Sequence, residues 1–137
     1  MQHDCFQHFN LGMDILCQAR SGTGKTTFYI IAILQQIDPI ENSVQALVIT
    51  HSRELSKVIE REFFRYEKYL TAIKCHGFVG GISTREDIEY LKSETPNIVI
   101  GTPGKLINLV KQKNLDISKV KYFVIDDCQN VLESIGM

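Results

Sequence analysis

The sequence of 137 residues has no tryptophan, only three prolines and no long hydrophobic run. Its longest apolar stretch, FYIIAIL at residues 28–34, is far shorter than the roughly 20 residues that cross a bilayer as a helix. The first residues, MQHDCFQHF, lack the basic segment followed by an apolar stretch that marks a signal peptide. We therefore expect neither a membrane span nor a membrane partner.

Cysteine is also scarce, and the four cysteines lie far apart, at Cys5, Cys17, Cys75 and Cys128. No C-x-x-C pair is present in the sequence, which argues against a disulfide framework and a zinc cluster and favours a reducing compartment. Free cysteine is commonly buried and behaves as a small apolar side chain. We predict this structural role for each of the four.

The sequence has no excess of charge of one sign. Its 15 Lys and Arg residues stand against 16 Asp and Glu residues, which gives a net charge of −1. This balance excludes a strongly basic arm for nucleic acid and an acidic tail, but it allows a local basic stripe. The length and the 44% hydrophobic content suit one soluble domain with a sizeable core, so we assign residues 1–137 to a single domain.

Short apolar runs alternate with amphipathic stretches along the chain. The runs are rich in valine, isoleucine and phenylalanine, as in strands buried on both faces, and they are ILCQA (15–19), ALVIT (46–50), IKCHGFV (73–79), NIVIG (97–101) and KYFVID (121–126). The stretches with helical patterns follow the first four runs, at 24–37, 53–70, 83–92 and 103–112. This order predicts an α/β fold, a doubly wound, mainly parallel sheet flanked by helices. Ligands of such a sheet bind beyond the carboxyl ends of its strands.

The segment ARSGTGKTT at residues 19–27 matches the phosphate-binding loop A/G-x-x-x-x-G-K-[ST] and lies between a predicted strand and a predicted helix. The glycines allow backbone N–H groups to approach phosphate oxygens, the lysine reaches the outer phosphates, and the hydroxyl after it ligates Mg²⁺. The predicted nucleotide-binding residues are Ala19, Ser21, Gly22, Thr23, Gly24, Lys25, Thr26 and Thr27, with Thr26 on the metal. The alternative is a glycine-rich turn with an incidental lysine.

Three further strand ends carry residues that can hold phosphate groups. These residues are Arg53 after the second run, Gly80 and Gly81 after the third, and Thr102, Gly104 and Lys105 after the fourth. Hydroxyl, backbone N–H and cationic donors at the start of a helix attract phosphate. Each segment also has a simpler explanation. Ser52 could serve only as a helix N-cap before solvated charges, and the glycine pair could be an ordinary turn.

The fifth run ends in VIDDCQ, residues 124–129, which could be a metal site or a solvated turn. In phosphate-loop enzymes an apolar strand that ends in aspartate holds Mg²⁺, and a nearby polar residue orients the attacking water. Because a phosphate-binding loop is predicted in the same chain, we assign Asp126 to the metal and Asp127, together with Lys25, to catalysis.

The order and spacing of these motifs resemble the first RecA-like domain of a DEAD-box RNA helicase, and most closely the DECD-box subfamily of mRNA splicing and export helicases. The likeness covers essentially the whole chain and includes GMDILCQARSGTGKT (12–26), LQQ (34–36), HSREL (51–55), IVIGTPGK (98–105) and D-x-C (126–128). It implies a RecA-like P-loop fold, ATP and Mg²⁺ as cofactors, and RNA bound by its backbone phosphates along the three strand ends. Gln2 falls where that family has the glutamine that reads adenine.

Three features depart from the family pattern. The D-E-C-D motif is D-D-C-Q here, so Asp127 is shorter than glutamate by one methylene, about 1.5 Å of reach. Gln129 replaces a carboxylate that the family uses to communicate with its second RecA-like domain. Lys105 stands where arginine is usual, which keeps the charge but loses the bidentate fork.

Two hypotheses therefore remain for the function. The first is the ATP-binding domain of an ATP-dependent RNA helicase, which hydrolyses ATP only with a second RecA-like domain that this sequence does not contain. The alternative is a non-catalytic nucleotide- and partner-binding module derived from such a helicase. An unrelated phosphate-loop kinase is less well supported, because it does not need GTPGK after the fourth run. By resemblance we expect mRNA splicing or export factors as partners, and the nucleus, with shuttling to the cytoplasm, as the location.

Overall fold

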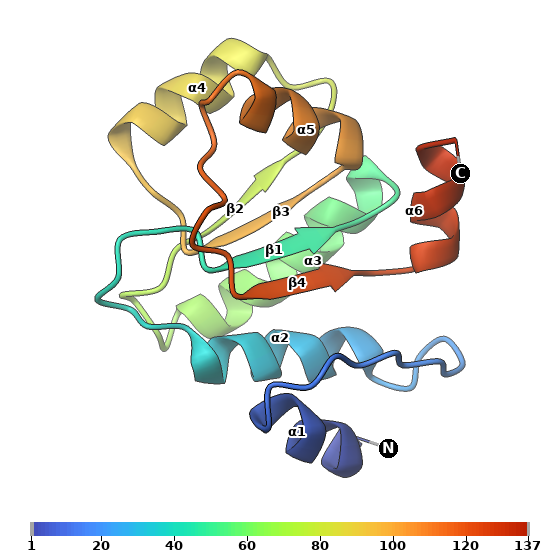
Figure 1. Ribbon diagram of the computed structural model, residues 1–137. Helices are drawn as coiled ribbons and strands as arrows, with labels where there is room; N and C mark the ends of the chain where they lie inside the picture. Colours follow the sequence, from blue (N-terminus) through green and yellow to red (C-terminus); the bar gives the residue numbers. More distant parts are fainter. Residues whose placement is uncertain (1, 137) are drawn as a thin grey trace. The chain divides into compact units, whose positions relative to one another are not determined.

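The computed structural model describes residues 2–136, with side chains from Cys5 onward (Figure 1). The chain divides into two compact units, one that ends at Gln36 and one that begins at Ile37. None of the helices in the described part of the chain has the length and apolar character that crossing a membrane requires.

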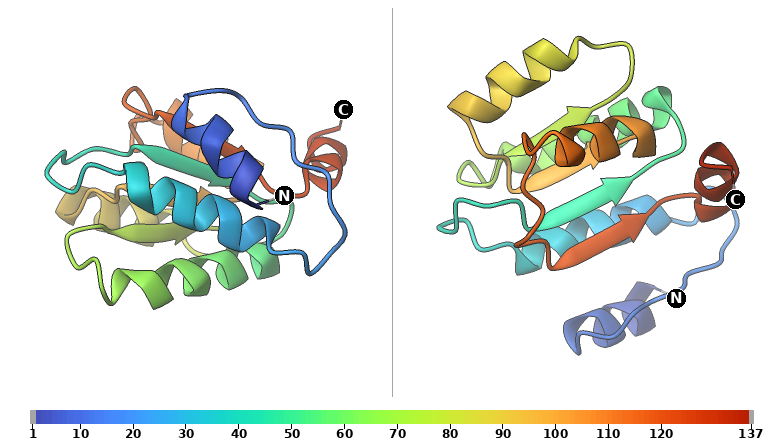
Figure 2. Two further views of the ribbon diagram at one scale, coloured as in Figure 1. Left: turned by 90° about the horizontal axis from the view of Figure 1, so that it is seen from below. Right: turned by 45° about the horizontal axis from the view of Figure 1, so that its top comes forward.

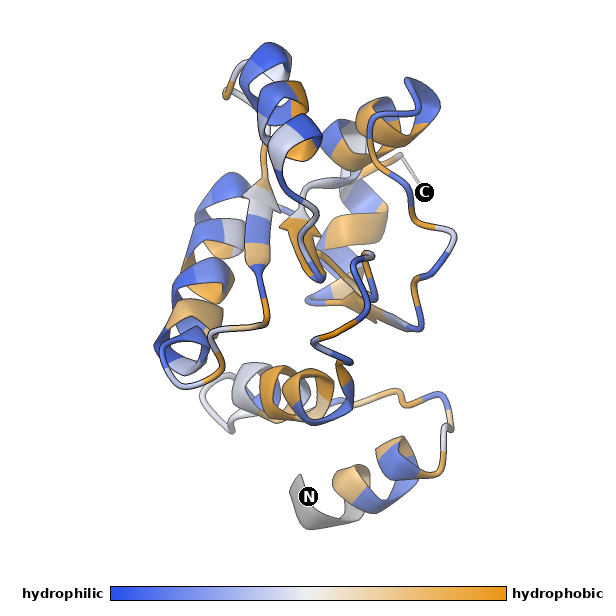
Figure 3. Cartoon of the chain, turned by 90° about the vertical axis from the view of Figure 1, so that its left-hand side faces the viewer, coloured by the Kyte–Doolittle hydropathy of each residue, from blue (hydrophilic) through white to orange (hydrophobic). Residues whose placement is uncertain are grey.

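The first unit contains two helices, α1 (Gln2–Asn10) and α2 (Lys25–Gln36). The Phe6 ring of α1 lies edge-on to the Phe28 ring of α2, with 4.8 Å between the ring centroids. At the other end of the pair, Gln36 Nε2 donates to Asn10 Oδ1 at 3.1 Å. Helix α2 confirms the helix predicted at 24–37, and its middle is hydrophobic (Figure 3). Helix α1 is too short and weakly patterned for sequence analysis to indicate it.

The second unit is an α/β sandwich built on four parallel strands in the order β2-β3-β1-β4 (Figure 1). The strands are β1 (Ala46–Ile49), β2 (Cys75–Phe78), β3 (Ile98–Gly101) and β4 (Tyr122–Ile125). The helices are α3 (Arg53–Glu67), α4 (Thr84–Ser93), α5 (Pro103–Lys111) and α6 (Cys128–Ser134). This architecture confirms the predicted α/β class and all four of the strands and three of the helices expected in this part of the chain.

The strand predicted at 15–19 does not form. Residues 13–20 have no regular secondary structure, and Leu16 is 90% exposed. A strand is stable only when a neighbouring strand takes up its backbone hydrogen bonds and a face of it is buried. Among the described residues, the unit that contains this segment has no strand of its own. Local composition indicated the strand, and the missing pairing prevents it.

Helices cover both faces of the sheet (Figures 1 and 2). Helix α3 packs against β2 and β3 and buries Ile59 and Phe63 completely. Helices α4 and α5 cover the opposite face. Side chains from β1, β2, β3 and α5 form the main cluster there, with Leu47, Phe78, Val99, Leu106 and Leu109 at its centre. The burial of β3 on both faces explains its uninterrupted apolar sequence.

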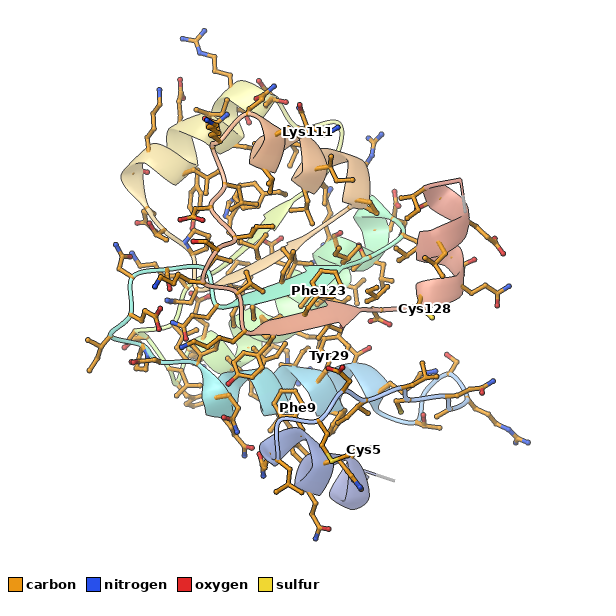
Figure 4. All side chains as sticks on the ribbon, in the orientation of Figure 1. Cys5, Phe9, Tyr29, Lys111, Phe123 and Cys128 are labelled. Carbon is orange, nitrogen blue, oxygen red and sulfur yellow. The ribbon has the colours of Figure 1, made fainter. Side chains whose placement is uncertain are left out.

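The edge strand β4 differs from the prediction that every strand is buried on both faces. Its residues alternate between half-buried and exposed, and Phe123 is 58% exposed (Figure 4). Burial of all four cysteines was also predicted, and the structure confirms it for Cys75. Cys5 and Cys17 are only partly buried, and Cys128 is exposed at the start of α6. Burial raises the pKa of the Cys75 thiol, so this cysteine stays a neutral, unreactive thiol.

Buried polar side chains connect the amino-terminal ends of the strands. Asn97, which is 4% exposed, accepts a hydrogen bond from Lys74 N at 3.0 Å. Its amide donates to the backbone oxygens of Glu41 at 3.0 Å and Ser43 at 3.4 Å. Asn97 therefore joins the loop before β1 to the start of β2, and the sheet begins at the same level across three strands.

We expect Asn97→Ala to lower the free energy of unfolding by about 2–4 kcal/mol, because it removes these hydrogen bonds and leaves buried backbone groups unsatisfied. Urea unfolding measures the loss. Asn108→Ala is the matched control, since Asn108 is exposed on α5 and bonds only to the nearby Gln112 in the described structure. We expect its change to stay within about 0.5 kcal/mol. Equal losses for the two variants would contradict the anchoring role of Asn97.

Candidate nucleotide loop and strand-end phosphate site

The predicted phosphate-binding loop turns directly into the amino terminus of α2. Gly22 and Gly24 have φ values of +80° and +86°, the left-handed conformation that glycine adopts without strain. The Thr23 hydroxyl donates to Arg20 O at 2.8 Å and closes the turn. The Lys25 ammonium reaches back across the loop to Ala19 O. The loop is thus curved around a cation at the positive end of a helix.

The residues of this loop fit a bound polyphosphate. No atom lies within 4 Å of the position that a Cβ would take at Gly22, so that side of the loop is open. Thr26 and Thr27 lie in the first turn of α2, where backbone N–H groups point toward an anion. Gln2 begins α1, but its side chain lies outside the described residues. Adenine recognition by Gln2 therefore stays a prediction.

No group of three His, Cys, Asp or Glu side chains within the described chain surrounds a possible metal position. Mg²⁺ commonly takes one or two protein ligands and completes its shell with phosphate oxygens and water. Thr26 and Asp126 are the residues of the right type to supply those ligands.

In the second unit, three segments that follow β1, β2 and β3 lie at the carboxyl edge of the sheet. We call them the strand-end shelf, which comprises Arg53, Gly80, Gly81, Thr102, Gly104 and Lys105. Parallel pairing brings them together, because Ile49 pairs with Gly101 and Phe78 also pairs with Gly101 in the sheet. The structure thus places side by side the residues that sequence analysis assigned to phosphate binding.

Arg53 lies against the glycine pair. Gly81 has a φ of +87°, and a Cβ added at Gly81 would collide with the Arg53 guanidinium. At Gly80 the nearest atom to an added Cβ is Arg53 Nε, at 3.7 Å. Ser52 caps α3 by accepting from Leu55 N at 3.2 Å, so the simpler role considered for Ser52 is present. Arg53 itself is exposed at the surface.

The amino terminus of α5 provides the other half of the shelf. Thr102 is the N-cap residue, but its side chain makes no capping hydrogen bond to α5. Gly104 is exposed, and nothing lies within 4 Å of the position of a Cβ there. Backbone N–H groups at such a helix start can donate to an anion. The shelf therefore combines one exposed guanidinium with an accessible helix N-terminus.

Lys105 has a different environment from Arg53. Its side chain is 7% exposed, and its ammonium donates to Ile82 O at 2.8 Å and to Thr84 Oγ1 at 3.3 Å. Asp87 Oδ2 lies 2.6 Å from the same ammonium, and the Asp87 side chain is 3% exposed. This oxygen has no hydrogen bond of ordinary geometry in the described structure, so its contact with Lys105 is chiefly electrostatic. Lys105 thus points into the fold, where sequence analysis had expected a surface donor.

The two aspartates of VIDDCQ occupy different positions. Asp126 continues the ladder beyond β4, and its N–H donates to Ile49 O at 2.9 Å. Asp127 is the N-cap of α6 and has left-handed backbone angles, φ 54° and ψ 58°. Aspartate adopts this conformation more readily than most residues, because its short polar side chain bonds locally. Gln129 is exposed and donates to Glu133 Oε1 at 3.3 Å within α6.

Two residues that sequence analysis did not single out for this role lie close to the Asp127 carboxylate. Asn130 Nδ2 donates to Asp127 Oδ2 at 2.5 Å. His51 Nδ1 lies 3.9 Å from the same oxygen and is a buried atom without a hydrogen-bond partner in the described structure. The i, i+3 spacing of Asn130 could have indicated its contact, whereas the approach of His51 depends on the pairing of β1 with β4. Asp127 Oδ2 is therefore turned toward its own helix.

Comparison with known proteins places the chain in a family. Residues 1–137 match the DEAD/DEAH box helicase family. The chain is 44% identical over 137 residues to the ATP-dependent RNA helicase DDX39A of Homo sapiens, and 45% identical over 138 residues to the ATP-dependent RNA helicase WM6 of Drosophila melanogaster. Each alignment covers 100% of this chain and 32% of the relative. The chain thus spans about a third of the length of these relatives.

A solved structure agrees with this assignment. It is a variant of S. cerevisiae Dbp5 bound to Nup159, a Gle1 variant, IP6 and ADP, with a TM-score of 0.74 and 29% identity. The similarity covers 87% of this chain and 30% of that chain. Family, sequence relatives and fold lead to one conclusion. The chain belongs to the DEAD/DEAH box helicase family.

Proposed function

We propose that this domain binds MgATP through residues 19–27 and RNA backbone phosphates through the strand-end shelf. The observation that carries the proposal is the loop at the start of α2, where two left-handed glycines curve the backbone around Lys25. Such a loop offers N–H donors and a cation to a polyphosphate. Adenine selection by Gln2 completes the proposed nucleotide site.

In this proposal charged and polar side chains of the domain stabilise the transition state of ATP hydrolysis and orient the attacking water. Lys25 stabilises negative charge on the outer phosphates as the terminal phosphoryl group transfers. Thr26 and Asp126 hold Mg²⁺, which supplies further charge neutralisation when it is bound. Asp127 orients the attacking water, and a second RecA-like domain supplies the remaining residues that closure requires.

RNA binding rests on two kinds of donor in the shelf. The exposed Arg53 guanidinium supplies charge, while the start of α5 supplies the backbone N–H of Gly104 and the positive end of the helix. Neither kind of contact reads a base. The shelf therefore binds RNA without sequence preference, and its affinity falls as salt rises.

The second candidate is a nucleotide-binding module that does not hydrolyse ATP. The observation that favours it is the short Asp127 carboxylate, whose Oδ2 is occupied by Asn130. Misplacement of a catalytic group by about 1 Å can lower a rate about a hundredfold. Gln129, exposed on α6, adds no carboxylate to the site. Both candidates share the same ATP and RNA contacts and differ only in turnover.

The relatives suggest a biological setting for the whole protein. The Dbp5 structure contains Nup159 and Gle1, and the sequence resembles helicases of mRNA splicing and export. We extend this to the present chain as a proposal: a role in mRNA processing or transport, with protein partners from those processes. Location in the nucleus, with passage to the cytoplasm, follows from the same proposal.

We expect Lys25→Ala to lower MgATP affinity by about tenfold to a hundredfold, because it removes a charge-assisted hydrogen bond to the phosphates. Isothermal titration of the chain with MgATP measures this change. Lys111→Ala is the control, since it removes an equal charge from an exposed position at the end of α5. Equal affinities for Lys25→Ala and the unmodified chain would show that residues 19–27 are not the nucleotide site.

The substitution Asp127→Glu separates the two candidate functions. It restores the missing methylene, and we expect RNA-stimulated ATP turnover to rise by up to about a hundredfold. The assay uses the chain with a second RecA-like domain supplied in trans. Asp116→Glu makes the same chemical change in an exposed loop, and we expect it to leave turnover unchanged. Nucleotide binding without turnover in the chain and in Asp127→Glu would leave only the module.

A further inference from the structure

The shelf contains two cations that the structure treats differently. Arg53 is exposed, whereas only 7% of the Lys105 side chain is exposed. An ammonium group has three donors. Two of those of Lys105 are donated to Ile82 O and Thr84 Oγ1, at 2.8 and 3.3 Å, and the Asp87 carboxylate lies 2.6 Å from the ammonium as its ion-pair partner. The ammonium is therefore engaged inside the fold and directed away from a phosphate at the surface.

Withdrawal of Lys105 toward a ligand would be strongly unfavourable. Asp87 is 3% exposed, and a buried carboxylate that loses its cation destabilises a fold severely. A cavity of about 320 Å³ borders Asp87, and the carboxylates of Glu60 and Glu86 also line it. His76 lines the same cavity, and burial lowers the pKa of its imidazole, so His76 adds no positive charge at neutral pH. The negative charge of these carboxylates thus keeps the Lys105 ammonium in its buried position beside Asp87.

The contacts of Lys105 lead to the part of the shelf that carries Arg53. Ile82 directly follows Gly81, and its carbonyl is held by Lys105. Gly81 in turn presents its left-handed backbone to the Arg53 guanidinium at close range. Lys105 lies on α5, Asp87 on α4 and Arg53 on α3. The ion pair therefore joins α5 to α4, and the Ile82 contact joins α5 to the loop against which Arg53 rests.

We propose that Lys105 is a positioning residue: paired with Asp87, it fixes the Gly80–Ile82 loop against which Arg53 rests, and it does not itself bind RNA phosphate. This rests on the proposed RNA function of the shelf and sharpens it. Arg53 and the first turn of α5 make the phosphate contacts, and Lys105 sets their spacing. An arginine at the same position keeps the charge and can donate to the same internal acceptors.

The salt dependence of RNA binding tests the proposal, because each neutralised phosphate of a single strand contributes about 0.7 to the slope of log K against log salt. The probe is a fluorescent single-stranded oligouridylate, titrated into the chain with a second RecA-like domain in trans. For Arg53→Ala we expect the slope to fall by about 0.7. For Lys105→Met we expect affinity to fall about tenfold with the slope unchanged, because Arg53 keeps its charge beside the phosphates and loses only the alignment of its hydrogen bonds.

Three further variants keep the test independent of folding. Lys105→Arg should retain the affinity of the unmodified chain. The double variant Asp87→Asn with Lys105→Met removes both charges of the buried pair, a change that commonly preserves stability. It should show the same weak affinity and unchanged slope as Lys105→Met. Asp87→Asn alone should also weaken binding, whereas a lysine that binds phosphate would bind RNA more tightly once released from Asp87.

A slope that falls by about 0.7 in Lys105→Met overturns the positioning role while leaving RNA binding intact. Affinity that is unchanged in Lys105→Met and in the double variant also overturns it. If the unmodified chain shows no salt-dependent binding, or if Arg53→Ala leaves the slope unchanged, the proposed shelf itself is wrong. Salt-dependent binding by the unmodified chain and the slope of Arg53→Ala test the RNA function, whereas the Lys105 variants test the positioning role. The two failures can therefore be told apart.

Discussion

The parallel register of the sheet is the constraint on which the second unit depends. Ile49 at the end of β1 pairs with Gly101 on one side and with Ile125 on the other. The strands therefore end at the same level. The residues that follow them, such as Thr102 after β3 and Asp126 after β4, lie at one edge of the sheet. A register shift of one residue would turn every side chain to the opposite face, exposing the core cluster. The hydrophobic core thus fixes where these strand-end residues lie.

Within that frame, burial assigns different tasks to residues of the same charge. Arg53 is solvated and can exchange water and counterions for phosphate at little desolvation cost. Lys105 is enclosed with Asp87, and its charge is balanced inside the protein. The two aspartates after β4 differ similarly. The backbone of Asp126 is hydrogen-bonded to β1. Asp127 is the N-cap residue of a short helix, has left-handed backbone angles, and accepts a hydrogen bond from Asn130 through its carboxylate.

Sequence analysis predicted the features that arise from local pattern. Apolar runs such as 97–101 and helices such as 103–112 need only composition and periodicity, and the structure confirms both. Features that depend on tertiary partners were not predictable. The run at 15–19 has strand composition but no strand, and Lys105 has the sequence context of a surface donor but a buried partner on another helix. Cys128 is exposed because the strand before it lies at the sheet edge.

The central claim is that the loop at 19–27 holds ATP and that the strand-end shelf holds RNA phosphate. Amide chemical shifts of the ¹⁵N-labelled chain test both parts in one titration series. We expect MgATP to shift the amides of Gly22 to Thr26 and oligouridylate to shift those of Arg53, Gly81 and Gly104. Oligouridylate shifts confined to other surfaces, or MgATP shifts that leave residues 19–27 unchanged, would contradict it.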